Sequence, residues 1–315
     1  MGEKDFRNPK YYTNRELSWV LFNHRVLNEA RDKSIPLFER LKFLSITASN
    51  LDEFFMIRVA SLKDMVNAGY EKKDIAGMTP LEQLTALHES IHELVELQYT
   101  TYNHSLLPLL EKSGLCVIKQ HEQLSEDEGA YVDQYFEDNV YPVLTPMAVD
   151  SSRPFPLIRN KSLNIGAMVR KKNTEEELEF ATVQVPSVLS RIVQLPTEGK
   201  AKKIILLEEI IERNIHKLFL NYDIVCAHPF RIMRNADLTI DEDEAADLLK
   251  EIEKQLKMRQ WGEAIRLEVE AGMDKRLLKI IKKELKIEGQ SLYEIEGPLD
   301  LTVLMKLYGL DGFQH

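Results

Sequence analysis

The chain has few residues that could cross-link its fold or anchor it in a membrane. Among 315 residues only Cys116 and Cys226 are cysteine, and each lies between apolar neighbours far from the other. Two such thiols exclude a disulfide framework and a cysteine-rich zinc site, and they are typical of a reduced, cytosolic protein. No apolar run approaches the roughly 18 residues that a membrane-spanning helix needs. Residues 1–12 lack the apolar core of an export signal.

The chain also has fewer basic than acidic residues. Lys and Arg number 41 against 51 Asp and Glu, which gives a net charge of −10. Proteins that hold nucleic acid over a broad face are usually basic, so this balance argues against nucleic acid as a partner. Hydrophobic content of 44% and a length sufficient for two cores indicate a globular, two-domain protein. We expect it in the cytoplasm, and peripheral association with the inner membrane face is an alternative that the sequence leaves open.

Apolar spacing predicts an antiparallel helical bundle over residues 1–114. Thr13 and Glu16 have the spacing of a capping box, in which each side chain bonds to the other's backbone N–H. Pro36 can occupy the first turn of a second helix. Residues 79–82 read Thr-Pro-Leu-Glu and open a long helix.

The most polar part of this bundle is the stretch 47–53, which lies between two apolar runs. Asn50 and Asp52 are residue types whose short side chains accept bonds from free backbone N–H groups at a helix N-terminus. The stretch therefore predicts the start of a third helix, which ends near residue 67.

Residues 115–315 mix strands with helices and predict an α+β domain with a mostly antiparallel sheet. Four prolines make 141–158 irregular. We interpret the turn-like end, 311–315, as an artificial boundary rather than the natural end of a domain. Strands are expected at 115–118, 163–169, 180–185, 191–195, 203–207, 224–234, 264–270 and 291–296, and helices at 125–139, 207–219, 242–258, 274–286 and 300–307.

Residues 88–92 read His-Glu-Ser-Ile-His on the expected long helix. Two imidazoles one turn apart can hold zinc, and the glutamate between them can activate water. The longer metalloprotease pattern would need glycine and histidine where the chain has Val95 and Gln98. Glu111 could be a distant third ligand, but Pro108 predicts a break in the helix before it. We therefore expect no metal site in this chain.

Several segments, taken in order along the chain, are similar to a known family. They are ELSWVLFNHRVLNEA at 16–30, SNLDEFFMIRV at 49–59, RPFPLI at 153–158, HPFRIMRNAD at 228–237, AIRLEVE at 264–270 and LYGLDGF at 307–313. Together they resemble the front half of bacterial polyphosphate kinase, of the type whose catalytic half resembles phospholipase D. The resemblance covers essentially all of the chain.

This resemblance implies an N-terminal helical domain at 1–114 and an α+β head domain at 115–315, without the catalytic domains. The parent enzyme would reversibly transfer the terminal phosphate of ATP to inorganic polyphosphate through a phosphohistidine, with Mg²⁺. The family's asparagine in SNLDEF contacts the nucleotide, which maps to Asn50. No catalytic residue is expected in this chain, and neither ATP nor Mg²⁺ should be held tightly by it. The head domain implies a homo-oligomer, with ATP, ADP and polyphosphate as the other partners.

Alternatives remain for each of these residues. The amide of Asn50 can either read a nucleotide or cap a helix. Arg58 could face phosphate or form a salt bridge. Arg231 and Arg234 lie three apart on an extended segment and so face opposite sides, where either could meet phosphate or an acidic side chain. The alternative function is a non-catalytic interaction or dimerisation module with no nucleotide contact.

Overall fold

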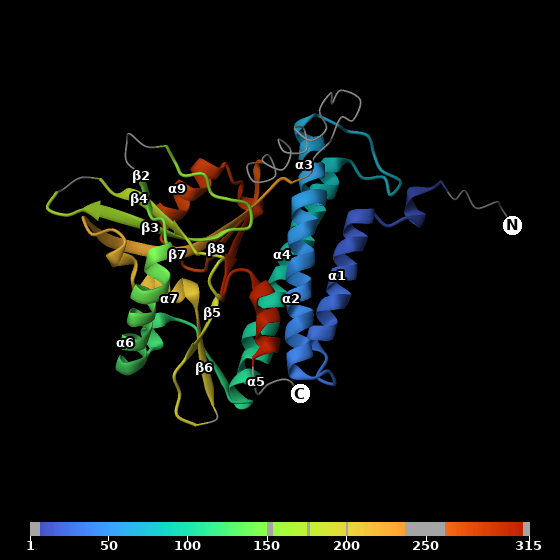
Figure 1. Ribbon diagram of the computed structural model, residues 1–315. Helices are drawn as coiled ribbons and strands as arrows, with labels where there is room; N and C mark the ends of the chain where they lie inside the picture. The colour runs from blue at the N-terminus through green and yellow to red at the C-terminus, as the bar shows by residue number, and fades with distance from the viewer. Residues whose placement is uncertain (1–6, 150–153, 175–176, 200, 237–261, 311–315) are drawn as a thin grey trace, which may run out of the picture.

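The computed structural model describes residues 7–149, 154–174, 177–199, 201–236 and 262–310. Figure 1 shows long helices on one side of the molecule and a sheet region with shorter helices on the other. Within the described residues, no helix is both long and apolar enough to cross a membrane. The expected order, a helical part followed by an α+β part, is confirmed.

The helical part is a bundle in which leucine is the most frequent buried side chain. Consecutive long helices run antiparallel (Figure 1), and Leu27, Leu41 and Leu87 are fully buried between them. Each such side chain contributes about 1.5–3 kcal/mol through removal from water. The elements are η1 (Pro9–Tyr11), α1 (Arg15–Arg31), α2 (Leu37–Phe54), η2 (Phe55–Val59), α3 (Ala60–Asn67), α4 (Pro80–Thr100), η3 (Thr101–Leu106) and α5 (Leu107–Lys112).

Side-chain caps fix the starts of two of these helices. The expected helix start at 79–82 is confirmed, and the structure adds a capping box there, in which Thr79 and Glu82 each accept the other's backbone N–H. The capping box expected at Thr13 is wrong by one residue. Asn14 is the N-cap of α1, and its side chain accepts from the backbone N–H groups of Glu16 and Leu17.

The predicted helix start at 47–53 is also wrong. Helix α2, the π-helical turn η2 and α3 form one continuous helical segment over 37–67. Asn50 and Asp52 therefore lie well inside a helix, where no free backbone N–H groups remain to be capped. Their side chains bond instead to other parts of the molecule, Asn50 to α1 and Asp52 to the sheet.

Pro108 does not break the helical segment in which it lies. Helix α4 continues into the π-helical η3, and α5 follows directly. The backbone N–H of Leu107 bonds to the carbonyl of Tyr102, five residues earlier. The wider π-helical turn changes which carbonyl faces each N–H, so the chain accommodates a proline, which has no N–H, without ending the helix.

The described residues of the α+β part form two sheets. The smaller has the strand order β1-β6-β5 and the larger β2-β4-β3-β7-β8-β9; all pairs are antiparallel except β1–β6 and β8–β9. The mostly antiparallel expectation is thus confirmed. The strands are β1 (Leu115–Ile118), β2 (Met147–Val149), β3 (Leu163–Lys171), β4 (Glu179–Gln184), β5 (Ile192–Leu195), β6 (Lys202–Leu206), β7 (Tyr222–Arg234), β8 (Ala264–Glu270) and β9 (Leu292–Ile295).

Helices cover both faces of the larger sheet. Helix α9 packs Leu277 and Ile281 into an apolar cluster with Phe230 on one face. A Cβ atom at Gly166 of β3 would lie 3.1 Å from the Phe230 ring, so a larger residue there would press on that ring. Ile165 of β3 lies on the opposite face, in the cluster that includes α7 and the bundle. The helices of this part are α6 (Glu126–Tyr135), α7 (Leu207–Arg213) and α9 (Lys275–Leu285), with shorter turns η4 (His121–Gln123), η5 (Phe136–Val140), η6 (Tyr141–Val143), η7 (Ile215–Lys217), η8 (Gly289–Ser291) and η9 (Leu301–Gly309).

Most expected elements of this part lie within a few residues of their predicted positions. The expected helix at 242–258 lies outside the described residues. The expected helix at 300–307 is the 3₁₀ helix η9. Pro229 lies in a strand interior to the sheet; it pairs with Ile165 of β3, and the β8 ladder starts at the next residue. Its missing N–H therefore leaves no gap in that second ladder.

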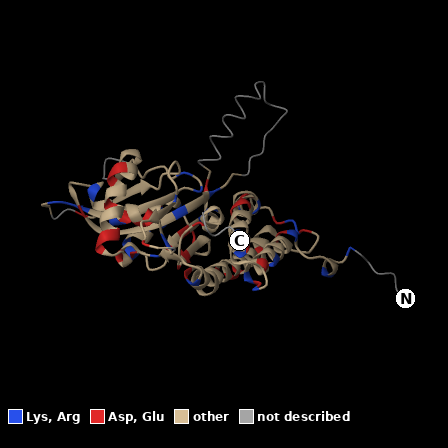
Figure 2. Ribbon diagram, turned by 60° about the horizontal axis from the view of Figure 1, so that its bottom comes forward, with Lys and Arg blue, Asp and Glu red and all other residues tan. Residues whose placement is uncertain are grey.

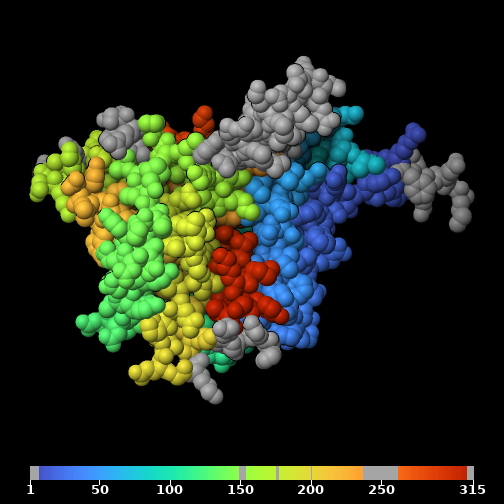
Figure 3. All heavy atoms as spheres, in the orientation of Figure 1, coloured from blue at the N-terminus to red at the C-terminus, as the bar shows by residue number. Residues whose placement is uncertain are grey.

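The chain returns to the helical bundle at its C-terminal end. Helix η9 packs on α2, and Figure 3 shows it between α2 and the strands of the smaller sheet. Ser45 Oγ donates to the carbonyl of Thr302 at 3.1 Å, and Tyr99 donates its hydroxyl to the carbonyl of Pro298 at 2.9 Å. The two parts therefore share a packed interface rather than a flexible linker.

A buried arginine forms the centre of this interface. Arg231 of β7 is 2% exposed, and its guanidinium donates to Asp52 of α2 at 2.5 and 3.1 Å and to Glu268 of β8 at 2.9 Å. Asp300, before η9, lies 3.8 Å from it. Burial alone would lower the pKa of Arg231, but the surrounding carboxylates, Asp52 first, raise it well above its usual value. The guanidinium therefore stays charged.

We predict that Arg231→Met lowers the free energy of unfolding by about 3–5 kcal/mol, because Asp52 and Glu268 would be left buried without their cation. Denaturant unfolding of the chain measures this change. Arg276→Met is the matched control: its guanidinium pairs with Asp274 on the surface, where the side chain is 55% exposed. The control should change stability by less than about 1 kcal/mol. Equal effects of the two substitutions would contradict the central role of Arg231.

Candidate functional site

Asn50, the nucleotide-contact residue expected from the sequence, belongs to a network of amides between three helices. Its Nδ2 donates to Asn23 Oδ1 of α1 at 3.2 Å, and Asn23 Nδ2 donates to the carbonyl of Thr47 at 3.0 Å. Gln98 of α4 donates to Thr47 Oγ1 at 2.9 Å. Asn23 and Thr47 are fully buried, whereas Asn50 is half-buried at the edge of the network. This network fixes the direction of the Asn50 amide.

Part of the Asn50 side chain is still free to bind. The structure gives its Oδ1 no partner among the described residues, while Nδ2 is held by Asn23. An amide oxygen accepts hydrogen bonds, for example from an exocyclic amino group. The arrangement can therefore present an oriented acceptor at the bundle surface.

Asp52 lies two residues further along α2 and faces away from Asn50. Residues two apart on an α-helix are separated by about 200° around its axis. Asp52 accordingly binds Arg231 on the sheet side, while Asn50 binds Asn23 on the α1 side. Lys161 Nζ lies 3.5 Å from Asp52 Oδ2. The Asp52 carboxylate is thus held by two cations and forms part of the joint between the bundle and the sheet.

The three arginines that the sequence singled out are all engaged in contacts within the chain. Arg58 pairs with Glu16 of α1 through both Nε and Nη2. Arg231 forms the buried cluster described above. Arg234 donates from Nε to the carbonyl of Ile158 and from Nη1 to that of Gly262. For Arg58 and Arg231 the salt-bridge alternative agrees with the structure; Arg234 binds backbone carbonyls instead.

The His-Glu-x-x-His segment packs against the sheet. His92 stacks on the Tyr293 ring with centroids 4.1 Å apart, and its Nε2 lies 3.0 Å from the carbonyl of Gln290. His88 is buried, and burial lowers its pKa to about 4, so its imidazole is neutral near pH 7. Among the described residues, neither histidine belongs to a group of three residues with metal-ligand spacing.

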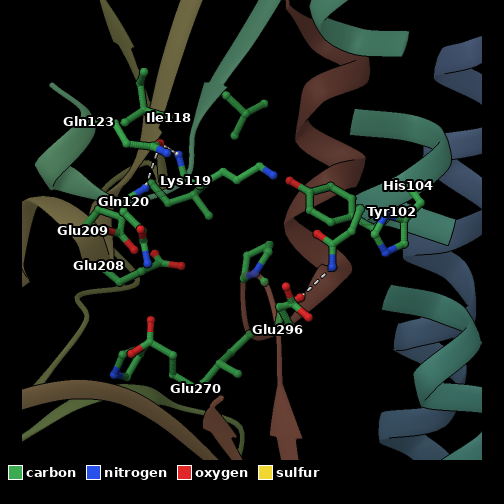
Figure 4. A pocket seen from close by; sticks show the side chains of 17 residues that line it. Tyr102, His104, Ile118, Lys119, Gln120, Gln123, Glu208, Glu209, Glu270 and Glu296 are labelled. Carbon is green, nitrogen blue, oxygen red and sulfur yellow. Dashed lines mark hydrogen bonds between the residues drawn. The ribbon is translucent and has the colours of Figure 1, made fainter. Parts of the chain in front are cut away.

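A pocket of about 350 Å³ lies where the end of α4 and η3 meet the α+β part. Figure 4 shows Tyr102 and His104 on one side and Glu208, Glu209 and Glu270 on the other. None of the residues expected from the sequence to bind nucleotide or phosphate lines it. The lining is Tyr102, Asn103, His104, Val117, Ile118, Lys119, Gln120, Gln123, Leu206, Glu208, Glu209, Pro229, Glu270, Glu296, Gly297, Pro298 and Leu299.

Glutamates of this wall continue into a cluster that the sequence did not suggest. Glu209 and Glu212 lie one turn apart on α7, next to His121 of η4 on one side and to His228 and Glu270 on the other. Burial, followed by the charges of Glu209 and Glu270, raises the pKa of Glu212 to about 9. The residues are far apart in the sequence, and the one local signal is the pair of glutamates on a short helix.

Acidic residues outnumber basic ones in the chain, which has a net charge of −10. Figure 2 shows Lys and Arg interspersed with Asp and Glu along the ribbon.

Two family models match the chain in sequence order. The model described as "Polyphosphate kinase N-terminal domain" matches residues 12–118, and the one described as "Polyphosphate kinase middle domain" matches residues 127–307. The first match contains Asn50 and Asp52, and the second contains Arg231. The residues matched by the two models therefore contact each other at the interface that contains Asp52 and Arg231.

Curated relatives and a solved structure show the same likeness. Polyphosphate kinase of Halalkalibacterium halodurans is 49% identical over 306 residues, and that of Lactiplantibacillus plantarum is 50% identical over 303; each match covers 96% of this chain. The chain spans 43% and 42% of those two proteins. The crystal structure of polyphosphate kinase from Porphyromonas gingivalis superimposes with a TM-score of 0.75 at 26% identity, covering 93% of this chain and 40% of that one. This chain therefore belongs to the polyphosphate kinase family, as its N-terminal and middle domains.

Proposed function

We propose that this chain is the nucleotide-covering and dimer-forming portion of an enzyme that reversibly transfers the terminal phosphate of ATP to inorganic polyphosphate. The observation that carries the proposal is the pair of family matches over 12–118 and 127–307. Within the proposal, residues 1–114 are the helical domain and 115–315 the head domain. Mg²⁺ and the phosphate-accepting histidine would belong to catalytic domains beyond this portion.

In this proposal Asn50 contacts the nucleotide. Its position supports the role, because the side chain is held by a buried network on a continuous helix and its Oδ1 has no partner among the residues that the structure describes. A contact group on a rigid element loses little entropy when the ligand binds. The cap role, its main competitor, is excluded because Asn50 lies inside α2.

The buried cluster of Arg231 supports the same role indirectly. Asp52 ties α2 to β7 two residues after Asn50, so the orientation of the Asn50 helix relative to the head domain is fixed. Phosphoryl transfer depends mainly on positioning and charge neutralisation, so a nucleotide contact must sit on a well-placed element.

We predict that Asn50→Ala, made in a full-length enzyme carrying this chain, raises the apparent KM for ATP roughly three- to twelve-fold. This is the effect of losing one hydrogen bond of about 0.5–1.5 kcal/mol. Steady-state kinetics with varied ATP and fixed polyphosphate measures it, with thermal stability followed in parallel. Asn28→Ala is the matched control, since it removes the same amide from an exposed position of α1.

Unchanged ATP kinetics in Asn50→Ala, at unchanged stability, would contradict the nucleotide contact. It would favour the alternative function, a non-catalytic interaction or dimerisation module. The proposed dimer contact is tested separately by the mass of the chain in solution, because a monomer at all accessible concentrations would argue against self-association through this portion.

We also predict that the chain by itself transfers no phosphate. A phosphohistidine route needs an imidazole in line with the terminal phosphate and cations around the transferred oxygens. Of the eight histidines, His121 and His228 lie next to glutamates and His88 is buried. With Asn50 as its one contact, ATP should bind only with a Kd on the order of millimolar.

Incubation with γ-labelled ATP and Mg²⁺, followed by an alkaline gel, measures acid-labile phosphohistidine on the chain. We expect none above background, whereas a full-length enzyme is the positive control. Stoichiometric label on any of the eight histidines would place the catalytic centre within this chain and contradict the proposal.

A further inference from the structure

We propose that the cluster around Glu212 is a binding site for one divalent transition-metal ion. Ligand atoms of His121, Glu209 and Glu212 all lie within 4.8 Å of one another, and so do those of Glu212, His228 and Glu270. Glu212 is common to both groups. The site lies apart from Asn50 and does not depend on the proposed function.

The geometry of each histidine supports this proposal. His228 Nδ1 lies 2.7 Å from Glu270 Oε2, and His121 Nδ1 lies 3.3 Å from Glu209 Oε2. The side chains of Glu209, His121, His228 and Glu270 are only 12%, 20%, 21% and 28% exposed, respectively. Each triad thus brings one imidazole and two carboxylates together, largely out of water, and Glu209 and Glu270 lie at the wall of the pocket.

Three glutamates of the cluster have oxygen atoms that could still bind a cation. Glu208, the neighbour of Glu209 on α7, is paired with Arg191, whereas Glu209, Glu212 and Glu270 have no lysine or arginine partner among the described residues. Glu212 has neither a hydrogen bond nor an ion pair within that part of the chain. Carboxylates taken out of water are normally paired or bound to a metal.

The proposed ligands lie on regular secondary structure of three kinds, namely a helix, two strands and a 3₁₀ turn. Glu209 and Glu212 are three apart on α7 and so share a helix face, while His228 and Glu270 belong to the neighbouring strands β7 and β8. His121 is held against α7 by its backbone N–H, which donates to Glu209 at 2.9 Å. Figure 4 shows Glu209 and Glu270 at the wall of the pocket, so a bound ion would face an open space of about 350 Å³.

The donor set selects the class of ion. Imidazole and carboxylate without thiolate suit Zn²⁺, Co²⁺ or Ni²⁺, whereas Mg²⁺ and Ca²⁺ prefer oxygen ligands alone. The expectation of no metal site rested on local sequence spacing, which contains no trace of ligands at 121, 209, 212, 228 and 270. The proposed ion is therefore distinct from the Mg²⁺ that would accompany ATP.

Titration of the chelator-treated chain with Co²⁺ tests the site, because cobalt bound to nitrogen and oxygen ligands gives a visible absorption band. We expect saturation at one Co²⁺ per chain, displacement by Zn²⁺, and no displacement by millimolar Mg²⁺. Zn²⁺ should also raise the Tm by a few degrees, since an ion that binds only the folded state stabilises it. Absence of saturable binding up to millimolar Co²⁺ would overturn the proposal.

Two variants decide whether the binding belongs to this cluster. Glu212→Gln keeps the shape of the side chain but removes the shared carboxylate, and should weaken Co²⁺ binding at least tenfold and abolish the Tm shift caused by Zn²⁺. The double variant His88→Ala, His92→Ala removes the other zinc-like motif and should leave the cobalt titration unchanged. Wild-type affinity in Glu212→Gln, or its loss in the double variant, would contradict the assignment. Circular dichroism of both variants confirms that they are folded.

Discussion

A charge buried between two domains is the constraint on which the rest of this structure depends. The charge of Arg231 can be buried because Asp52 and Glu268 lie within hydrogen-bond distance of its guanidinium. A different alignment of α2 and the sheet would separate the guanidinium from Asp52 in a region of low dielectric, at a cost of several kcal/mol. The apolar core could tolerate small shifts of packing, but this cluster permits one arrangement. The register between bundle and sheet follows from it.

A second buried arginine, Arg266, lies next to the Arg231 cluster. Glu268 also binds Arg266, whose guanidinium lies over the rings of Phe55 and Tyr293 at 4.7 and 4.4 Å. His92 stacks on the far side of Tyr293. A layered stack of rings and a cation thus joins η2, β8, β9 and α4. His92 belongs to the segment whose histidine spacing resembles a zinc site. In the structure its ring packs on Tyr293.

The sequence predicted the elements of this fold better than their connections. Strands such as β3 and β4, and the capped start of α4, follow from local spacing and turn chemistry, and they were found where expected. The helix start at Asn50 and Asp52 was wrong because local rules assign short polar side chains to caps. Their true partners are Asn23 and Arg231, and the second lies 179 residues away. The cluster around Glu212 could not be foreseen for the same reason.

The π-helical turn η2 gives the interface a contact of another kind. Within it, the carbonyl of Met56 accepts a hydrogen bond from the backbone N–H of Ala236 at 3.0 Å. Both partners are main-chain groups, so the bond does not depend on which side chain stands at position 56 or 236, proline excepted at both. A single substitution can remove a member of a charged cluster. The hydrogen bond between Ala236 and Met56 depends instead on the backbone conformation. Homologous chains that have diverged in their surface residues could therefore keep the same alignment of helix and sheet.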